Sequence, residues 1–177
     1  KLISSHSTQV SVSREDISAM VSVATEEEVV EKDEKKIIQN ILKLDEFNAH
    51  MIMTPSVVVE MAPSDMTVKE LYDSELTHSR IPVYDAENDE YVTGYVLRQE
   101  ILEKMAEDKF ATKLDDILRP ILRFGEDVPV GDIWEALIEK KEHISVIIDE
   151  YGSVRGIVTM EDVIETMLGV EIVDEND

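Results

Sequence analysis

Apolar and polar positions recur along the second part of the chain in two stretches that share one order of elements. Each stretch has apolar residues at helical spacing, then two short β-branched runs, then a second helical pattern. The first helical pattern starts at Val68 in one stretch and at Val130 in the other, 62 positions later. A glycine in the last run, Gly94 or Gly156, recurs at the same interval. A recurrence of this length predicts a duplicated supersecondary unit.

The two copies are expected to be βαββα units of an α+β protein, packed with pseudo-twofold symmetry. A proline, Pro55 or Pro120, follows a short extended piece and stops any helix ahead of each unit. Acidic turns after Asp85 and Asp149 convert each pair of strands into a hairpin, and their separation of 64 positions predicts a turn two residues longer in the first copy. The predicted helices cover residues 68–76, 101–105, 130–140 and 163–168, and the predicted strands cover residues 81–84, 91–97, 146–148 and 154–159.

Two acidic helices are predicted ahead of the repeats. Ser13 offers a capping hydroxyl and Asp16 a carboxylate three residues later, which is the start signal of a helix. Because the helices have no core of their own, we expect them to pack on the following unit, on a second copy or on whatever precedes Lys1. The expected organisation is a flexible N-terminus with acidic linker helices over residues 1–47, the second helix running over 31–45, then one unit over 48–110 and another over 111–177.

Composition narrows the class of protein further. The 177 residues contain no cysteine, so disulfides, thiolate metal sites and cysteine nucleophiles are excluded, and a reducing compartment such as the cytosol is expected. The formal charge of −23 would repel the phosphates of a nucleic acid, which is therefore not an expected partner. No apolar run approaches the roughly 20 residues that span a bilayer. The chain opens with Lys1 and no signal pattern, so we expect it to be a piece of a longer protein.

Motifs for catalysis and for protein-bound metal are missing. The four histidines lack metal-ligand spacing, and residues 85–89 resemble a calcium loop only in charge. No glycine-rich phosphate loop, nucleophile elbow or histidine-based triad is present. We therefore expect a protein that is not an enzyme. The histidines concerned are His6, His50, His78 and His143.

Several pieces of the chain resemble, in order, the CBS pair of the CorC/CNNM (cyclin M) magnesium-transport family. They are Ile52-Met53-Thr54-Pro55, Ser79-Arg80-Ile81-Pro82-Val83-Tyr84, Asp149-Glu150-Tyr151-Gly152 and the run from Gly156 to Glu165, and the tail from Gly169 to Asp177 is similar as well. The resemblance implies tandem CBS domains, a Bateman module, that bind ATP with Mg²⁺ in the cleft between them, form a homodimer and regulate a membrane domain from its cytoplasmic face. One position departs from the pattern, because members usually follow Met-Thr-Pro with arginine and Ser56 stands here.

Thr159 and Asp162 are the candidate ribose-binding residues. A strand that ends at Thr159 and turns into a helix puts a hydroxyl and a carboxylate three residues apart on one side of the turn. A carboxylate accepts two hydrogen bonds at once, which suits the vicinal hydroxyls of a ribose. The same pattern is also a helix capping box, which needs no ligand, so both interpretations stay open.

Two neighbours complete the candidate site. Ile157 is expected to pack against the sugar or base of a nucleotide, with a plain core position as the alternative. Glu161 would repel a bare triphosphate, which is a physical reason to expect Mg²⁺ bound through the ATP phosphates rather than through protein ligands.

The repeat provides an internal comparison. Leu97 and Glu100 take the places of Thr159 and Asp162 in the first copy, so we expect that half to bind ribose poorly and each chain to hold one nucleotide. Arg80 aligns with Ile144 and is expected to reach the phosphates from the first copy, as the matching arginine does in the family that the chain resembles. A surface salt bridge is the alternative role of Arg80.

The leading hypothesis is a cytosolic sensor. ATP with Mg²⁺ would change the angle between the two units or the dimer contact, and the acidic helices would pass this change to the protein's own transmembrane domain. Two alternatives remain: an interaction module whose cleft stays empty, so that ATP leaves thermal stability unchanged, or a module that regulates an attached enzyme through an adenosine ligand. The ribose contacts do not distinguish ATP from other adenosine nucleotides.

Overall fold

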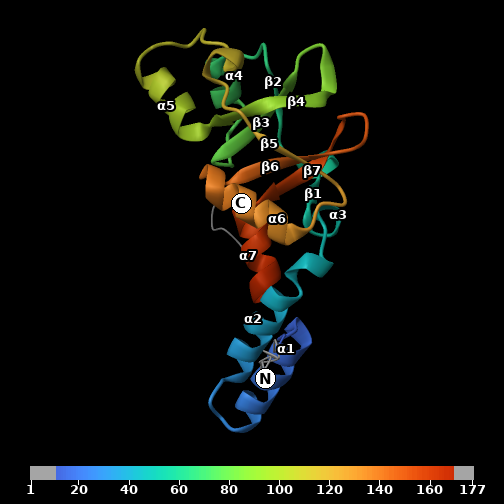
Figure 1. Ribbon diagram of the computed structural model, residues 1–177. Coiled ribbons are helices and arrows are strands. Elements are labelled where there is room, and N and C mark those ends of the chain that lie inside the picture. The colour runs from blue at the N-terminus through green and yellow to red at the C-terminus, as the bar shows by residue number, and fades with distance from the viewer. Residues whose placement is uncertain (1–10, 170–177) are drawn as a thin grey trace, which may run out of the picture.

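Two small sheets, one for each repeat, form the centre of the protein (Figure 1), and the computed structural model describes residues 11–169. The first sheet has the strand order β2-β3-β4 and the second has the order β1-β7-β6-β5. The strands are β1 (Thr54–Pro55), β2 (Ala62–Pro63), β3 (Arg80–Asp85), β4 (Asn88–Leu97), β5 (Leu122–Gly125), β6 (Ile144–Ile148) and β7 (Val154–Thr159). The helices of the units are α4 (Val68–Asp73), α5 (Arg98–Ala106), α6 (Val130–Lys140) and α7 (Met160–Leu168). The predicted α+β fold with two βαββα units is confirmed.

Strand registers show which positions of the two units are equivalent. Arg80 pairs with Leu97 in the first hairpin, and Ile144 pairs with Thr159 in the second. These pairs match the alignment of the two copies by sequence, in which Arg80 corresponds to Ile144 and Leu97 to Thr159. The internal comparison between the two candidate sites therefore rests on equivalent backbone positions.

The extended piece at the start of each unit lies on the sheet of the other unit. Strand β1 comes before the βαββα elements of the first unit but pairs with β7 of the second, with Thr54 opposite Ile157. Arg119 comes before the βαββα elements of the second unit but exchanges two backbone hydrogen bonds, of 2.8 and 3.0 Å, with Tyr95 of the first. The sequence predicted these extended pieces and did not predict their exchange, which ties the two units together.

At each of these two crossings, where the extended piece of one unit passes over a strand of the other, the strand has a glycine. A Cβ atom on Gly94 would come within 2.3 Å of the carbonyl oxygen of Arg119, and a Cβ atom on Gly156 would come within 2.4 Å of that of Thr54. Such distances leave no room for a side chain, so only glycine permits the approach.

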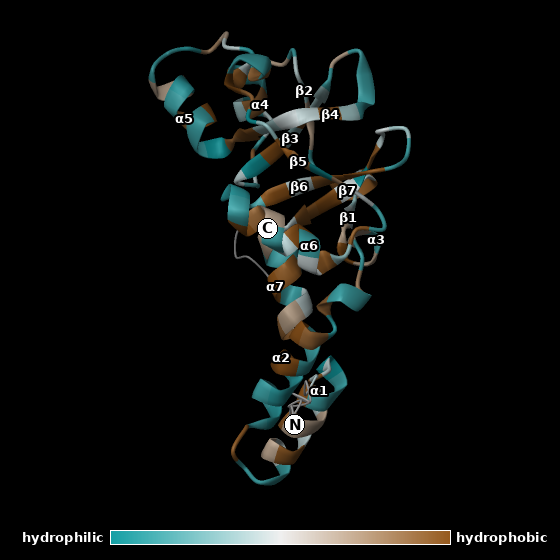
Figure 2. Cartoon of the chain, viewed as in Figure 1, coloured by the Kyte–Doolittle hydropathy of each residue, from teal (hydrophilic) through white to brown (hydrophobic). Residues whose placement is uncertain are grey.

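Each unit has a hydrophobic core of its own, and a third cluster joins the two units. Val68, Ile81 and Ile101 are fully buried in the first core, as are Val130, Ile133 and Val158 in the second. In Figure 2, brown stretches are prominent in β6, β7 and α7 of the second unit. The buried members of the joining cluster are Val92, Tyr95, Ile121, Ile144 and Val146, with Leu97 and Ile157 among the half-buried residues packed against it.

Several element boundaries differ from the sequence prediction. Helix α4 ends at Asp73 instead of residue 76, because Glu75 takes a left-handed conformation with a φ of 61°. Helices α5 and α7 begin directly after β4 and β7, three residues earlier than predicted. The longer turn predicted for the first hairpin is wrong: β3 and β4 are joined at the pair Asp85–Asn88, and the extra residues form an irregularity within β4.

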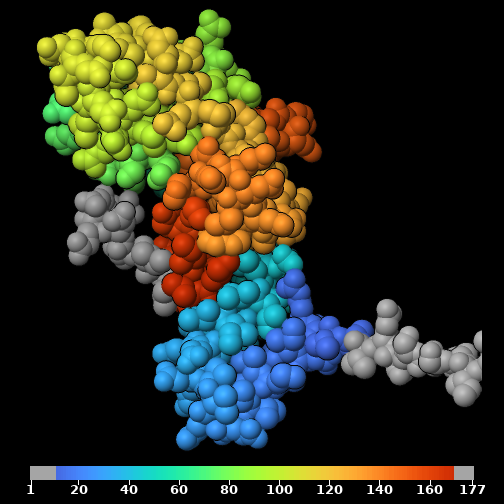
Figure 3. Space-filling model, turned by 60° about the vertical axis from the view of Figure 1, so that its left-hand side comes forward, coloured from blue at the N-terminus to red at the C-terminus, as the bar shows by residue number. Residues whose placement is uncertain are grey.

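Two helices form a hairpin that extends away from the sheets (Figures 1 and 3). Helix α1 (Arg14–Glu26) begins with the predicted capping box, in which the Ser13 hydroxyl accepts from the backbone N–H of Asp16 and the Asp16 carboxylate accepts from that of Ser13. Helix α2 (Lys32–Leu42) is followed by a single 3₁₀ turn, η1 (Leu44–Glu46), rather than continuing to residue 45. Neither α1 nor α2 contains a buried residue among the positions that the structure describes.

The hairpin contacts the second unit through α7. The side-chain amide of Asn40 on α2 donates a 3.0 Å hydrogen bond to the carbonyl oxygen of Met167 near the end of α7. The packing of α2 on the following unit is thereby confirmed, whereas α1 packs on α2. Across residues 11–169, none of the helices combines the length and the apolar character needed to cross a lipid bilayer. The expectations for residues 1–10, which include His6, and for the tail from residue 170 lie outside the described residues.

Candidate functional site

The candidate site lies where the facing sheets of the two units meet. In an antiparallel pair, residues opposite each other project from the same face of the sheet. Thr159 therefore shares a face with Ile144 and Ile157, and Arg80 shares a face with Leu97. Since Ile144, Ile157 and Leu97 all pack in the joining cluster, Thr159 and Arg80 stand on the facing surfaces of the two units.

Thr159 and Asp162 form a complete capping box at the start of α7. The Thr159 Oγ1 accepts a 3.2 Å hydrogen bond from the backbone N–H of Asp162, and the Asp162 Oδ2 accepts a 2.8 Å bond from the backbone N–H of Thr159. The capping interpretation is thus confirmed. These two bonds leave the second carboxylate oxygen of Asp162 able to accept from other partners, so the cap and a ligand contact are compatible.

The Asp162 carboxyl group is electrostatically unusual. Burial raises its pKa to about 6, hydrogen bonds to the carboxyl group from the backbone N–H and the side chain of Thr159 act in the opposite direction, and the charges of Glu165 and Glu161 raise it further. A half-buried carboxylate in such surroundings is destabilised unless hydrogen-bond donors solvate it. Perturbed groups of this kind occur often at functional sites, which makes Asp162 a candidate for ligand binding on physical grounds.

Ile157 and Glu161 lie on either side of the cap. Ile157 is half-buried, packs against the joining cluster and pairs with Thr54, and its contact with a ligand stays a prediction. Glu161 is exposed in the first turn of α7. Within residues 11–169, no group of three or more acidic or histidine side chains is arranged to hold a metal ion.

Thr54 is a candidate site residue that sequence reasoning missed. It lies beside Ile157, two positions from Thr159, because β1 pairs with β7. The segment that follows, η2 (Ser56–Val58), also contacts β7 and begins with the serine that departs from the family pattern. The Met-Thr-Pro motif was the available signal, but motif similarity does not say which unit the segment touches.

Arg80 starts β3 and lies close to the contact between the units. The Tyr95 hydroxyl donates a 2.7 Å hydrogen bond to the Glu142 Oε2 of the second unit. Burial and this bond with Glu142 raise the pKa of Tyr95, while the charges of Arg119 and Arg80 act to lower it. The positive charge of Arg80 therefore acts on the Tyr95 hydroxyl, which donates the hydrogen bond to the second unit.

The first unit lacks the capping box that Thr159 and Asp162 form in the second. Leu97 precedes α5 without a side-chain capping bond, whereas Thr159 caps α7. The carboxylate of Glu100 instead lies 3.8 Å from the guanidinium Nε of Arg119. The predicted asymmetry of the two half-sites is present in the geometry, and the poorer binding of ribose by the first half stays a prediction.

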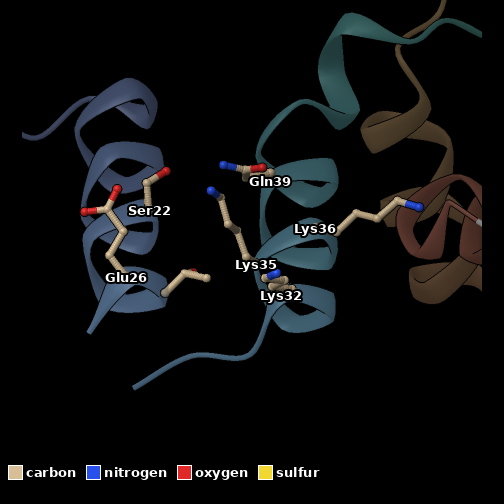
Figure 4. A pocket seen from close by; sticks show the side chains of 7 residues that line it. Ser22, Glu26, Lys32, Lys35, Lys36 and Gln39 are labelled. Carbon is tan, nitrogen blue, oxygen red and sulfur yellow. The ribbon is translucent and has the colours of Figure 1, made fainter. Parts of the chain in front are cut away.

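Two hollows in the described surface lie away from these residues. One of about 480 Å³ lies between α1 and α2, where Lys35 points toward Ser22 and Lys36 points away from α1 toward α7 (Figure 4). The other, of about 670 Å³, lies where β5 and β6 end, at the far end of the sheet from Thr159, beside the acidic residues Glu126 and Asp149. Neither is lined by Thr159, Asp162 or Arg80, and solvated surface lysines or carboxylates alone do not define a site.

Comparison with known proteins identifies the family. The sequence model of the CBS domain matches residues 49–107 and again residues 114–169, so the chain belongs to the CBS domain family and carries two such domains. Among curated proteins, it is 32% identical to the UPF0053 protein sll1254 of Synechocystis over 169 residues, and 27% identical to the magnesium and cobalt efflux protein CorC of Salmonella typhimurium over 166 residues. These alignments cover 94% and 93% of the chain but 48% and 56% of the relatives. The chain thus spans about half the length of the curated relatives that it matches.

Solved structures point in the same direction. The CBS domain of the bacterial CNNM/CorC family Mg²⁺ transporter aligns with a TM-score of 0.86 at 29% identity, over 93% of this chain and all of that one. A structure of that CBS domain in complex with ATP aligns with a TM-score of 0.73 at 29% identity, over 77% of this chain and 98% of that one. The resemblance to the CBS pair of the CorC/CNNM family is confirmed.

Proposed function

We propose that the chain is the regulatory CBS pair of a transporter or efflux protein for Mg²⁺ or other divalent cations, at the cytoplasmic face of a membrane. In this proposal it binds one ATP with Mg²⁺ at the junction of the two units, and nucleotide binding controls transport. The names of the relatives, which include magnesium and cobalt efflux proteins, support a regulatory role rather than a catalytic one. The similar CBS domain that was solved with ATP supports an adenosine nucleotide as the ligand.

The observation that carries the proposal is that Arg80 and Thr159, which caps α7 together with Asp162, stand on the facing surfaces of the two units. The Asp162 carboxylate would accept both ribose hydroxyls, with the Thr159 hydroxyl as a further contact. Arg80, on the facing surface, would neutralise the phosphates, and Ile157 would pack against the sugar or base. Because Glu161 adds negative charge beside the site, Mg²⁺ would enter with the phosphates of ATP.

Helix α7 offers a physical route from the nucleotide to the rest of the protein. Its first turn holds Asp162, and near its other end the carbonyl oxygen of Met167 accepts the hydrogen bond from Asn40 of α2. A ligand that draws Arg80 toward α7 would change the angle between the units and therefore the direction of the α1–α2 hairpin. Such coupling is reciprocal, so the transport-competent state would bind ATP with a different affinity.

Calorimetric titration with ATP, with and without Mg²⁺, tests the site. Asp162→Ala and Thr159→Ile are expected to weaken ATP binding at least tenfold, because each removes a polar contact with the ribose. Asp16→Ala is the matched control, since it opens the same kind of capping box at the start of α1, away from the site. Absence of ATP binding by the wild type, or wild-type affinity in both site variants, would contradict the proposal.

A second candidate function is an interaction module that binds no nucleotide and instead forms a homodimer or docks a partner. The observation in its favour is that the Thr159 and Asp162 side chains already satisfy each other's backbone as a cap. It predicts that ATP leaves the melting temperature unchanged, since a ligand that binds only the folded state must raise it. A role beside an attached enzyme has no support in the names of the relatives.

A further inference from the structure

One side-chain hydrogen bond between the two units lies next to the proposed phosphate position. Tyr95 of β4 is 4% exposed, and its hydroxyl donates to the Glu142 carboxylate at 2.7 Å. Glu142 belongs to the segment between α6 and β6 of the second unit. The bond therefore crosses the junction where the candidate nucleotide would bind.

The backbone fixes the position of Glu142 from both sides. The left-handed conformation of Lys141, with a φ of 55°, ends α6, and the Glu142 N–H then donates a 2.9 Å bond to the carbonyl oxygen of Leu137. The next residue, His143, accepts a 3.0 Å bond from the N–H of Met160, the first residue of α7. Glu142 is thus held beside the turn that carries Thr159 and Asp162.

The same hydroxyl lies close to Arg80. Tyr95 and Arg80 project from one face of the first sheet, because Arg80 pairs with Leu97 two positions beyond Tyr95. The charge of Arg80 acts on the Tyr95 hydroxyl, as does that of Arg119, whose backbone bonds to Tyr95. Glu142 consequently places a negative charge in the region where phosphates would approach Arg80.

We propose that Glu142 is a specificity-determining residue of the candidate site, held by Tyr95 so that its carboxylate disfavours ligands in proportion to their uncompensated phosphate charge. The inference rests on the proposed nucleotide function and deepens it. Glu142 itself touches neither ribose nor base; it acts on the phosphates through charge. A nucleotide whose phosphates carry Mg²⁺ meets less repulsion than a bare one, so Glu142 favours the magnesium complex over free nucleotide. Repulsion of Glu142 by the phosphates also weakens its bond with Tyr95, which links ligand charge to the contact between the units.

Two substitutions separate the charge from the hydrogen bond. Glu142→Gln removes the charge and keeps an oxygen that accepts from Tyr95, whereas Tyr95→Phe removes the bond and keeps the charge. Glu139→Gln, at an exposed position on α6 one turn earlier, is the matched control for loss of a carboxylate. The ligands are adenosine, AMP, ADP and ATP, each titrated calorimetrically into the chain at fixed ionic strength, with and without Mg²⁺.

Glu142→Gln is expected to bind Mg²⁺-free ATP roughly fivefold more tightly than the wild type, as removal of one like charge at intermediate distance and dielectric implies. The gain shrinks from ATP through ADP to AMP, vanishes for adenosine, and is smaller when Mg²⁺ is present. Tyr95→Phe shows part of this gain together with a lower melting temperature, and Glu139→Gln behaves as the wild type.

Unchanged ATP affinity in Glu142→Gln, or an equal change for adenosine and ATP, overturns the inference while the proposed function stands, provided that the wild type binds ATP and Asp162→Ala does not. If the wild type binds no nucleotide, the proposed function fails and the inference fails with it.

Discussion

At the scale of single residues, opposing influences act on the pKa of the Asp162 carboxyl group. As part of the cap it accepts a hydrogen bond from the backbone of Thr159, which favours the ionised form. Burial and the neighbouring acids oppose ionisation more strongly, so its pKa is raised to about 6. An ionised carboxylate that served only as a helix cap would cost less free energy in an exposed position. Asp16 at the start of α1 is such a case, because its bonds with Ser13 lower the pKa of its carboxyl group.

The raised pKa of Asp162 predicts how stability depends on pH. The folded state binds the proton more tightly than the unfolded state, so ionisation of Asp162 costs stability as the pH rises from about 4 to above 6. Asp162→Asn, which cannot ionise, should therefore gain stability relative to the wild type as the pH increases from 4 to 7, by an amount on the order of 1–3 kcal/mol. Thermal unfolding of both proteins across this range measures the difference.

Asp16→Asn is the control for that experiment, because the lowered pKa of Asp16 reverses the sign. Ionised Asp16 stabilises the folded state, so its substitution should destabilise at pH 7 and lose its effect in acid as the pH falls through the lowered pKa. A stability difference between Asp162→Asn and the wild type that does not vary with pH would contradict the account of Asp162.

At the scale of elements, the exchange of extended pieces between the units decides where the site residues come together. Strand β1 brings Thr54 to β7, and Arg119 lies against Tyr95 in β4. Gly94 and Gly156 permit these two crossings. Each unit therefore depends on a segment from the start of the other, and the junction is part of the fold rather than a loose contact between domains.

Substitution of the crossing glycines is expected to destabilise the whole chain. Gly156→Ala places a Cβ atom against the carbonyl oxygen of Thr54, and Gly94→Ala does the same with Arg119. Because a backbone oxygen cannot rotate away as a side chain can, we expect a loss of about 2–3 kcal/mol in the free energy of unfolding for each. Gly125→Ala, which meets no atom within 4 Å, should be nearly neutral in denaturant titrations. Equal effects at the three positions would show that the crossings are not tight.

Sequence patterns predicted elements with strong local signals and missed contacts that depend on the other unit. Helix α6 and strand β7 have their predicted ends because apolar periodicity and flanking turn residues define them. The partner of β1 could not be predicted, since a two-residue strand has no periodicity and its pairing is distant in sequence. For the site, Thr159, Asp162 and Arg80 were visible through motif and repeat, whereas Glu142 belongs to no motif and emerges only from its contact with Tyr95.

At the scale of the whole molecule, the second unit lies between the first unit and the α1–α2 hairpin (Figure 3). Helix α7 touches the candidate site at its start and the hairpin near its end. The hairpin itself has no buried residue within the described part of the chain, so its orientation depends on α7 and on the turn η1, whose Leu44 is buried in the second core. This arrangement suits a device in which a change at the junction moves the hairpin.

One nucleotide is proposed to bind at the junction with its ribose on the second unit. The decisive measurement is a crystal structure of the chain with ATP and Mg²⁺. We expect a single ATP in each chain, its ribose hydroxyls bonded to Asp162 and its phosphates directed to Arg80. Nucleotide seated instead beside Leu97 and Glu100, or a junction that stays empty at saturating ATP, would contradict it.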